Sequence, residues 1–486
     1  MRTLIVGTLA VSASALFSAH MAFSIAQESQ TTKGVTAAQP ANAPDPDMRV
    51  KGLVTISHID EERWRFEYDL SRNVRSIMLG PKTEQYHATA WKLPADFHVT
   101  GGEGIYSYLE RRDGKSFKRV SVDVRTYGSM VKYAPQPFAV FDGGTAVNTG
   151  PLGFAASIGP SRAMTAFDPV YSFVGMADET IIIPGQERGA VTRIDIPSNG
   201  LFAYFGTVTG LRETEHVLSI LDDDFPKAFA DDYVSSVEAL ALLYDRQLRD
   251  ALPGKLVIMV SYQEAPAIGF GGGAQNFQIM AKAMGPEAPS AGREDVRKML
   301  LFFAHEMAHI WQASLGTDSA RWFGEGEAEL LALRSIERLG KMTAEEVATN
   351  LTARVAECVK SLHQTNLAES HLKGQPRANY TGGALVLAAA VAATGADGSR
   401  DDIFALDRAV GALDLDLRMN RPIEAFQTAV RTLGGTQEAA DAIGSFIQDR
   451  HDDPLLALRS LFDATGLAYR VDGDALHIEP SMTKKD

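Results

Sequence analysis

The feature that most constrains this chain is a histidine pair, His305 and His309, set with Glu306 in an apolar stretch. Residues 296–311 are almost entirely apolar apart from these three side chains and two basic residues at the start. Two acidic residues precede the stretch, as suits a helix N-terminus. The pattern predicts a buried helix that carries three polar side chains, and a buried helix must satisfy such groups.

The spacing of these side chains points to a metal site. Histidines four residues apart lie on one face of a helix, so His305 and His309 can aim ring nitrogens at one point. This is what a tetrahedral Zn²⁺ requires of its first two ligands. Glu306 can stand beside the metal without binding it, the position of the general base in H-E-x-x-H peptidases. The pattern fixes only three positions and also arises by chance, and on a surface helix it would mean little.

A second acidic group follows in a strongly helical run that extends to about Leu339. Glu325 and Glu329 are four residues apart and share a face. We expect Glu325 to complete the metal site and Glu329 to bond the free ring nitrogen of a ligating histidine. Glu327 points elsewhere and is expected to be solvated or to lie just behind the ligands. The alternative is an exposed helix face that carries three glutamates.

The segment 322–329, Trp-Phe-Gly-Glu-Gly-Glu-Ala-Glu, resembles the W-x-x-E-G-x-A segment of gluzincins, the zinc peptidases that include thermolysin, aminopeptidase N and the glycyl aminopeptidases. The resemblance extends over about residues 50–470 and is most specific over 269–385. It implies an α+β multidomain protein with a thermolysin-like catalytic domain and one Zn²⁺. The gap between His309 and Glu325 is a few residues shorter than is usual in aminopeptidase N relatives.

A glycine-rich segment that ends in Gly273, Ala274, Gln275 and Asn276 resembles the G-A-M-E-N edge strand of aminopeptidases. In that family the strand pairs with the backbone of the peptide substrate, and its glutamate captures the substrate α-amine. Gln275 takes the place of that glutamate here. A neutral amide binds a charged amine less well, so this position does not predict strict aminopeptidase action. The alternative is a flexible surface loop.

Tyr380 begins a segment that resembles the family's Y-x-K-G-A segment, with Gly382 in place of the lysine. In the family this tyrosine hydroxyl stabilises the oxyanion of the tetrahedral intermediate. We therefore expect Tyr380 to be catalytic, although a tyrosine at a helix start is more often a packing residue. His363 and His371, in the preceding loop, could donate the same hydrogen bond or could simply lie on the surface.

The rest of the sequence indicates the domain order. Strand-like alternation with frequent Gly and Pro predicts an N-terminal antiparallel β-sandwich-like domain, and the helical period dominates later. The expected organisation is a signal peptide at 1–26, a disordered linker at 27–47, the β domain at 48–210, the thermolysin-like catalytic domain at 211–395, and a helical lobe with a terminal β-hairpin at 396–486. A cleavable signal peptide predicts export to the periplasm or secretion.

Composition excludes several kinds of partner. The formal net charge of −14 argues against nucleic acid and against anionic membrane surfaces. No stretch after the leader reaches membrane length, so stable membrane insertion is not expected. The single cysteine, Cys358, cannot form an internal disulfide and is expected to be a buried apolar residue. We expect an exported zinc peptidase that acts on peptides or proteins. The alternatives are a zinc hydrolase of a non-peptide amide or ester and a zinc-containing binding protein.

Overall fold

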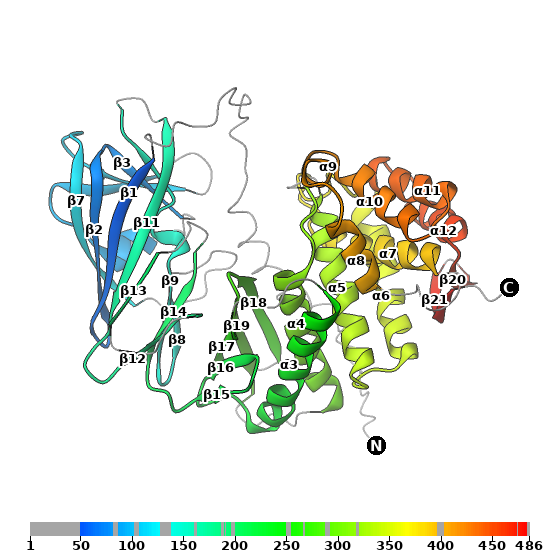
Figure 1. Ribbon diagram of the computed structural model, residues 1–486, viewed down its shortest axis with the longest axis horizontal. Helices are drawn as coiled ribbons and strands as arrows, with labels where there is room; N and C mark the ends of the chain where they lie inside the picture. Colours follow the sequence, from blue (N-terminus) through cyan, green and yellow to red (C-terminus); the bar gives the residue numbers. More distant parts are fainter. Residues whose placement is uncertain are drawn as a thin grey trace, which may run out of the picture.

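The protein is a mixed α+β chain with a sheet-rich N-terminal part and a helical C-terminal part, separated by a smaller sheet (Figure 1). The computed structural model describes residues 49–80, 86–101, 106–126, 138–159, 163–185, 189, 191–195, 200–248, 254–265, 268–286, 292–316, 320–395, 403–473 and 475–483. The expected leader and linker lie outside the described residues. The expected α+β architecture is confirmed.

The N-terminal β domain forms because its strands alternate apolar and polar residues. In β2, Trp64, Phe66, Tyr68 and Leu70 all point into the core while the residues between them are exposed. The elements of this domain are β1 (Val50–Asp60), β2 (Arg63–Val74), β3 (Ser76–Leu79), α2 (Tyr86–Ala90), β4 (Trp91–Lys92), β5 (Phe97–Gly101), β6 (Ser107–Arg111), β7 (Phe117–Arg125), β8 (Phe138–Phe141), β9 (Gly144–Asn148), η2 (Gly150–Leu152), β10 (Ala155–Ser157), β11 (Met164–Val174), β12 (Thr180–Ile182), β13 (Val191–Asp195) and β14 (Phe202–Gly206).

These strands form two sheets. The larger has the order β4-β7-β2-β1-β11-β10-β3-β6-β5, with β13 paired to β11, and the smaller has the order β12-β14-β9-β8. One pairing differs from the expected antiparallel arrangement, because β1 runs parallel to β11 from Val50 opposite Phe167 to Ser57 opposite Val174. Parallel pairing needs a long connection between the two strands, and the intervening strands provide it.

The middle part of the chain starts with a sheet of order β15-β16-β17-β19-β18, which leaves β18 at an edge. Helices α3 and α4 pack on one face of this sheet, and the smaller N-terminal sheet packs on the other (Figure 1). Its elements are β15 (Leu211–Glu213), β16 (Val217–Leu221), α3 (Lys227–Gln247), β17 (Leu256–Glu264), β18 (Gly269–Gln275), β19 (Gln278–Gly285), α4 (Arg293–Trp311), α5 (Arg321–Arg338), α6 (Ala344–Leu362) and α7 (Arg377–Thr394).

The C-terminal lobe packs against α5, α6 and α7 in the same apolar core. It comprises α8 (Ile403–Gly411), α9 (Leu415–Asn420), α10 (Pro422–Thr432), α11 (Gln437–Gln448), α12 (Pro454–Thr465), β20 (Leu467–Asp472) and β21 (Ala475–Thr483). The last two strands form the expected β-hairpin, which packs on α6. Cys358 is buried as expected, and burial raises the pKa of its thiol to about 12.

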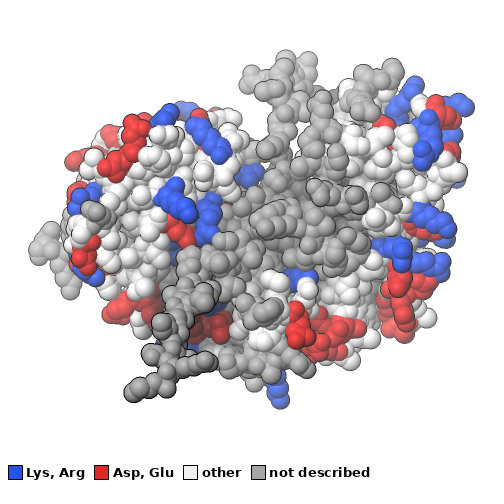
Figure 2. Space-filling view, turned by 180° about the vertical axis from the view of Figure 1, so that it is seen from behind, with Lys and Arg blue, Asp and Glu red and all other residues white. Residues whose placement is uncertain are grey.

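Two properties of the described residues concern hydropathy and charge. No helix in the described part of the chain has the length and hydropathy that a membrane crossing requires. On the face drawn in Figure 2, acidic and basic side chains are interspersed, and neither sign covers the visible described surface continuously.

Candidate metal centre

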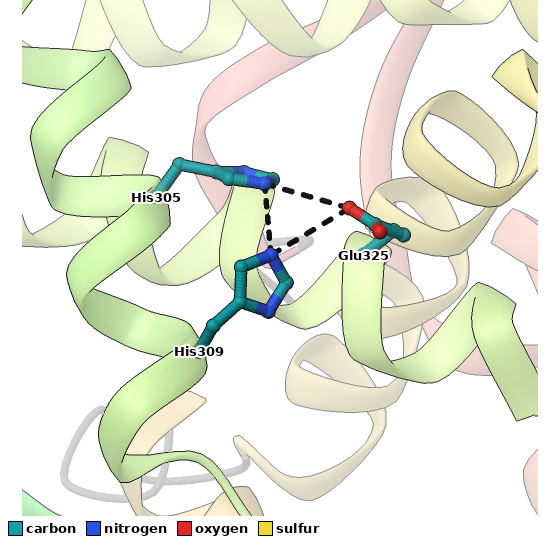
Figure 3. A group of neighbouring side chains, drawn as sticks. All are labelled: His305, His309 and Glu325. Atoms are coloured by element: carbon teal, nitrogen blue, oxygen red, sulfur yellow. Dashed lines mark hydrogen bonds and ion pairs between the residues drawn. The ribbon is translucent and has the colours of Figure 1, made fainter. Parts of the chain in front are cut away.

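Two helices bring the predicted metal ligands together. His305 and His309 project from successive turns of α4 toward Glu325 in the first turns of α5 (Figure 3). The His305 Nε2 and His309 Nε2 atoms are 3.1 Å apart. Glu325 Oε2 lies 3.4 Å from His305 Nε2 and 3.7 Å from His309 Nε2. One potential ligand atom from each side chain therefore faces a common point.

This triangle fits a zinc ion. Bonds of about 2.0–2.2 Å to imidazole nitrogen and carboxylate oxygen put neighbouring ligand atoms about 3.3–3.6 Å apart in a tetrahedron. The observed separations of 3.1, 3.4 and 3.7 Å bracket that range. Two imidazoles and one carboxylate are a zinc set, whereas Mg²⁺ and Ca²⁺ prefer oxygen ligands. The donors and their spacing support one Zn²⁺ and leave a fourth position for another ligand.

The surroundings keep the ligands in the form that binds metal. His305 and Glu325 are both buried, and Glu325 is only 2 % exposed. Burial, together with the nearby His305, lowers the pKa of His309 well below its ordinary value. His309 is therefore neutral near pH 7, and a neutral imidazole has a lone pair to give to a metal.

A carboxylate lies behind His305 on the side away from the ligand triangle. Glu329 Oε1 is 3.4 Å from His305 Nδ1. The other oxygen of Glu329 pairs with Arg354 Nη2, and Arg354 Nη1 donates to the Asn350 carbonyl at 3.0 Å. Burial alone would raise the pKa of Glu329, but the charges of Arg354 and His305 outweigh it and hold this pKa below its ordinary value. Glu329 is therefore placed as an ionised acceptor for the His305 ring.

The remaining predicted site residues lie on the same helices or on α7. Glu306 follows His305 in α4 and is buried. Tyr380 is buried in the first turn of α7, and its ring is stacked on that of His305 with centroids 5.9 Å apart. Glu327 is fully buried, which excludes a solvated side chain and leaves the alternative that it lies behind the ligands. The roles of Glu306, Tyr380 and Glu329 remain predictions.

Glycines allow α5 and α7 to cross very closely. A Cβ atom on Gly383 would lie 2.1 Å from the Trp322 carbonyl oxygen, and one on Gly326 would lie 2.3 Å from the Gly383 carbonyl carbon. Neither distance is possible for a larger residue without a shift of backbone. Since Gly326 follows Glu325 and Gly383 is one turn after Tyr380, this crossing sets how near α7 comes to the metal ligands.

The glycine-rich segment is an edge strand and not a surface loop. Residues Gly269–Gln275 form β18, which pairs with β19 on one side and lies at the edge of its sheet. The strand packs against α4, the helix that carries both histidines. This edge can add an extended peptide by backbone hydrogen bonds, as the resemblance to the G-A-M-E-N strand implies. The binding roles of Gly273, Ala274, Gln275 and Asn276 are predictions.

Sequence reasoning missed three side chains that hold this region in place. Arg354 is the partner of Glu329, Gln278 bonds to the N-terminal domain, and the buried carboxylate of Asp407 accepts from the Ala313 backbone N–H just after α4. None of them belongs to a local motif, because each partner lies far away in the sequence. The signal that could have found Arg354 is its place three residues after Leu351, next to the apolar face of its helix.

The chain resembles solved structures only weakly in sequence and in superposition. No protein-family model matches the sequence, and no curated protein matches it. Similar solved structures include an M1 zinc metallopeptidase from Deinococcus radiodurans (14% identity, 83% of this chain and 93% of that chain, TM-score 0.46). Another is a mutant of that enzyme from the same organism bound to a Tyr-Ser-Ala substrate (14% identity, 84% of this chain and 95% of that chain, TM-score 0.46). A third is leukotriene A4 hydrolase from Saccharomyces cerevisiae (13% identity, 87% of this chain and 68% of that chain, TM-score 0.43). A likeness of this size carries no conclusion about activity.

Proposed function

We propose that this chain is a zinc-dependent peptidase that hydrolyses peptide bonds. The observation that carries the proposal is the triangle of His305, His309 and Glu325, with Glu306 intact beside it. The described residues supply three ligands to this group, and three protein ligands with an open fourth position mark a catalytic zinc site, whereas structural sites are closed by four protein ligands. A structural site would also have no need of Glu306.

The reaction divides between the metal and the protein. Zinc held by these residues supplies a Lewis acid that polarises a carbonyl and acidifies water. Glu306 takes the proton from the attacking water and later delivers it to the leaving amine. The position of Glu306 supports this role, because it is buried next to His305 on α4 and is therefore shielded from bulk water.

Two further groups act on the substrate. Tyr380 donates a hydrogen bond from its hydroxyl to the oxyanion that develops on the attacked carbonyl, a contribution worth roughly 3–4 kcal/mol for one well-placed donor. Its position beside the His305 ring supports this role. The open edge of β18 binds the peptide backbone in an extended conformation. Glu329 lies behind His305 and orients its ring toward the metal.

Export is a further part of the proposal. It is supported by the sequence alone, in which Arg2, an apolar core over 4–17 and the small residues around Ala26 form a cleavable leader. N-terminal sequencing of the protein recovered from the medium or from an osmotic-shock fraction tests this. A protein that keeps its leader, or that stays with the cytosolic fraction, would contradict export without affecting the metal site.

A peptide library tests the proposed activity. The purified protein is assayed before chelation, after chelation and after zinc is restored. We expect cleavage that chelation abolishes and zinc recovers. Cleavage of ester or non-peptide amide substrates alone would move the assignment to another zinc hydrolase. Stoichiometric zinc without any turnover would identify a binding protein.

A further inference from the structure

Helices α3 and α4 hold the N-terminal end of the edge strand β18 in place. The Phe270 ring is stacked on the Phe302 ring, with centroids 6.1 Å apart and an interplanar angle of 24°. Phe302 lies in α4 one turn before His305, so this contact ties the start of the strand to the metal-bearing helix. Phe270 also meets Phe229 of α3 edge-on at 6.3 Å.

The middle of β18 consists of glycines, so no side chain packs this part of the strand in place. Gly271, Gly272 and Gly273 follow one another, and a Cβ on Gly272 would lie 2.2 Å from the Met280 carbonyl oxygen of β19. Glycine in a strand interior lowers its rigidity because it adds conformational freedom and no packing. The position of this segment must therefore be set from its two ends.

The second end is a strained two-residue turn. Gln275 is paired with Gln278, and the residues between them, Asn276 and Phe277, have φ values of 46° and 60°. This is the left-handed region that type I′ hairpin turns require, and asparagine tolerates it. Phenylalanine does so only when the surroundings impose the conformation. A strained residue at a hairpin tip indicates that other contacts hold the turn.

Those contacts come from the N-terminal β domain. The Gln278 amide bonds to both backbone polar groups of Phe202 in β14: Phe202 N–H donates to Oε1 at 2.8 Å, and Nε2 donates to the Phe202 carbonyl at 2.5 Å. Asn276 Nδ2 donates to the Gly200 carbonyl in the segment just before β14. Gln278 is only 1 % exposed, so these bonds are shielded from water.

The Gln278 amide makes the hydrogen bonds that a neighbouring strand would otherwise make to Phe202. β12 pairs with β14 only from Tyr204 to Gly206, so it ends before it reaches Phe202. On its other side Phe202 is opposite Asn148 of β9. The amide of Gln278 provides one donor and one acceptor, as a neighbouring peptide would, and so satisfies the Phe202 groups that β12 leaves. The turn after β18 is thereby joined to the N-terminal sheet as part of its hydrogen-bond pattern.

We infer that Gln278 is a positioning residue through which the N-terminal β domain fixes β18 beside the metal centre. The strand is held by α4 at Phe270 and by β14 at Gln278, and the glycines lie between these two contacts. The N-terminal domain thus governs how well an extended peptide binds without contacting it. This inference rests on the proposed function only where it concerns the peptide.

The test uses the full-length protein with Gln278→Met, which keeps the length of the side chain and loses both hydrogen bonds. Gln263→Met is the matched control, because Gln263 is an exposed glutamine of β17 in the same sheet. Amide hydrogen exchange is measured over β18. In parallel, the affinity for a fluorescein-labelled, uncharged decapeptide is measured in the Glu306→Gln background, which binds without turnover, and zinc content is measured for each protein.

For Gln278→Met we expect faster exchange in β18, roughly threefold to tenfold weaker peptide binding and unchanged zinc content, with no change in the control. If Gln278→Met is poorly folded, Asn276→Gly, which loses the bond to Gly200 and tolerates the left-handed φ, is expected to show the same pattern more weakly. Unchanged exchange, unchanged affinity or lost zinc would each overturn the inference. A wild-type protein that neither binds nor cleaves the decapeptide would instead refute the proposed function, and the exchange result would still decide whether the N-terminal domain holds β18.

Discussion

Replacement of Arg354 by methionine should weaken zinc binding although Arg354 does not touch the metal site. Arg354 holds one oxygen of Glu329, and the other oxygen lies 3.4 Å from His305 Nδ1. Without the arginine, burial is no longer opposed by its charge, and the pKa of Glu329 rises. Glu329 then protonates at a higher pH and stops orienting the His305 ring as an ionised acceptor.

The magnitude follows from two effects. Loss of an outer-sphere partner typically reduces metal affinity about 10–100-fold, which is about 1.4–2.7 kcal/mol. Arg354 acts only through Glu329, so the lower end is expected for Arg354→Met and the upper end for Glu329→Ala. Breaking a largely buried ion pair costs about 3–5 kcal/mol of folding stability, because one charge is left buried without its partner. The stability loss in Arg354→Met should therefore exceed the loss in zinc binding.

The assay is zinc competition with a chromophoric chelator across a pH series, together with urea unfolding of the metal-free protein. The folded-state pKa of Glu329 is below its unfolded value, so its contribution is present above the unfolded pKa and is lost as pH falls through the folded pKa. In Arg354→Met that loss should begin at a higher pH. Arg421→Met is the control, since Arg421 and Glu424 form an exposed pair worth about 0–1 kcal/mol.

The result that would refute this reasoning is zinc affinity equal to wild type in both Arg354→Met and Glu329→Ala over the whole pH series. Glu329 would then have no part in orienting His305. If Arg354→Met lowers the stability but leaves the zinc affinity of the folded protein unchanged, Arg354 contributes to folding and not to the metal site.

Two further predictions concern the ligand set and the helix crossing. Glu325→Ala should lose zinc almost completely, whereas Glu329→Ala should lose about 10–100-fold in affinity; metal analysis decides, and the reverse order would make Glu329 the ligand. Gly383→Ala should destabilise the protein by about 1–3 kcal/mol and reduce turnover, since its Cβ would lie 2.1 Å from the Trp322 carbonyl oxygen and force α5 and α7 apart. Gly254→Ala, where a Cβ meets nothing within 4 Å, is the control, and equal thermal midpoints for the two variants would contradict the close crossing.

The sequence predicted those features that depend on local periodicity. The four-residue spacing of His305 and His309 placed both rings on one helix face, and the helix is observed as α4. Alternation in β2 and the Asp-Gly turn near the C-terminus predicted a half-buried strand and a hairpin, and both are present. In each case one short segment contains the whole signal, because side-chain direction follows from the local backbone alone.

Features that depend on distant partners could not be predicted in this way. The parallel pairing of β1 with β11 joins Val50 to Phe167, and nothing in either segment specifies that partner or its direction. Full burial of Glu327 depends on what packs over α5, which its own helix does not reveal. The bond from Gln278 to Phe202 connects two domains through one amide, and a glutamine in a strand gives no sign of such a partner.

The most direct measurement of the central claim compares wild-type protein with Glu306→Gln, which keeps the shape of the side chain and removes its negative charge. Zinc content and peptide cleavage are measured side by side, with His305→Ala as the control that loses a ligand. We expect wild type and Glu306→Gln to hold one zinc each, His305→Ala to hold none, and turnover in Glu306→Gln to fall by roughly 10²-fold or more. Cleavage by Glu306→Gln at the wild-type rate would contradict the assignment of Glu306 as the base, and stoichiometric zinc in His305→Ala would contradict the metal centre itself.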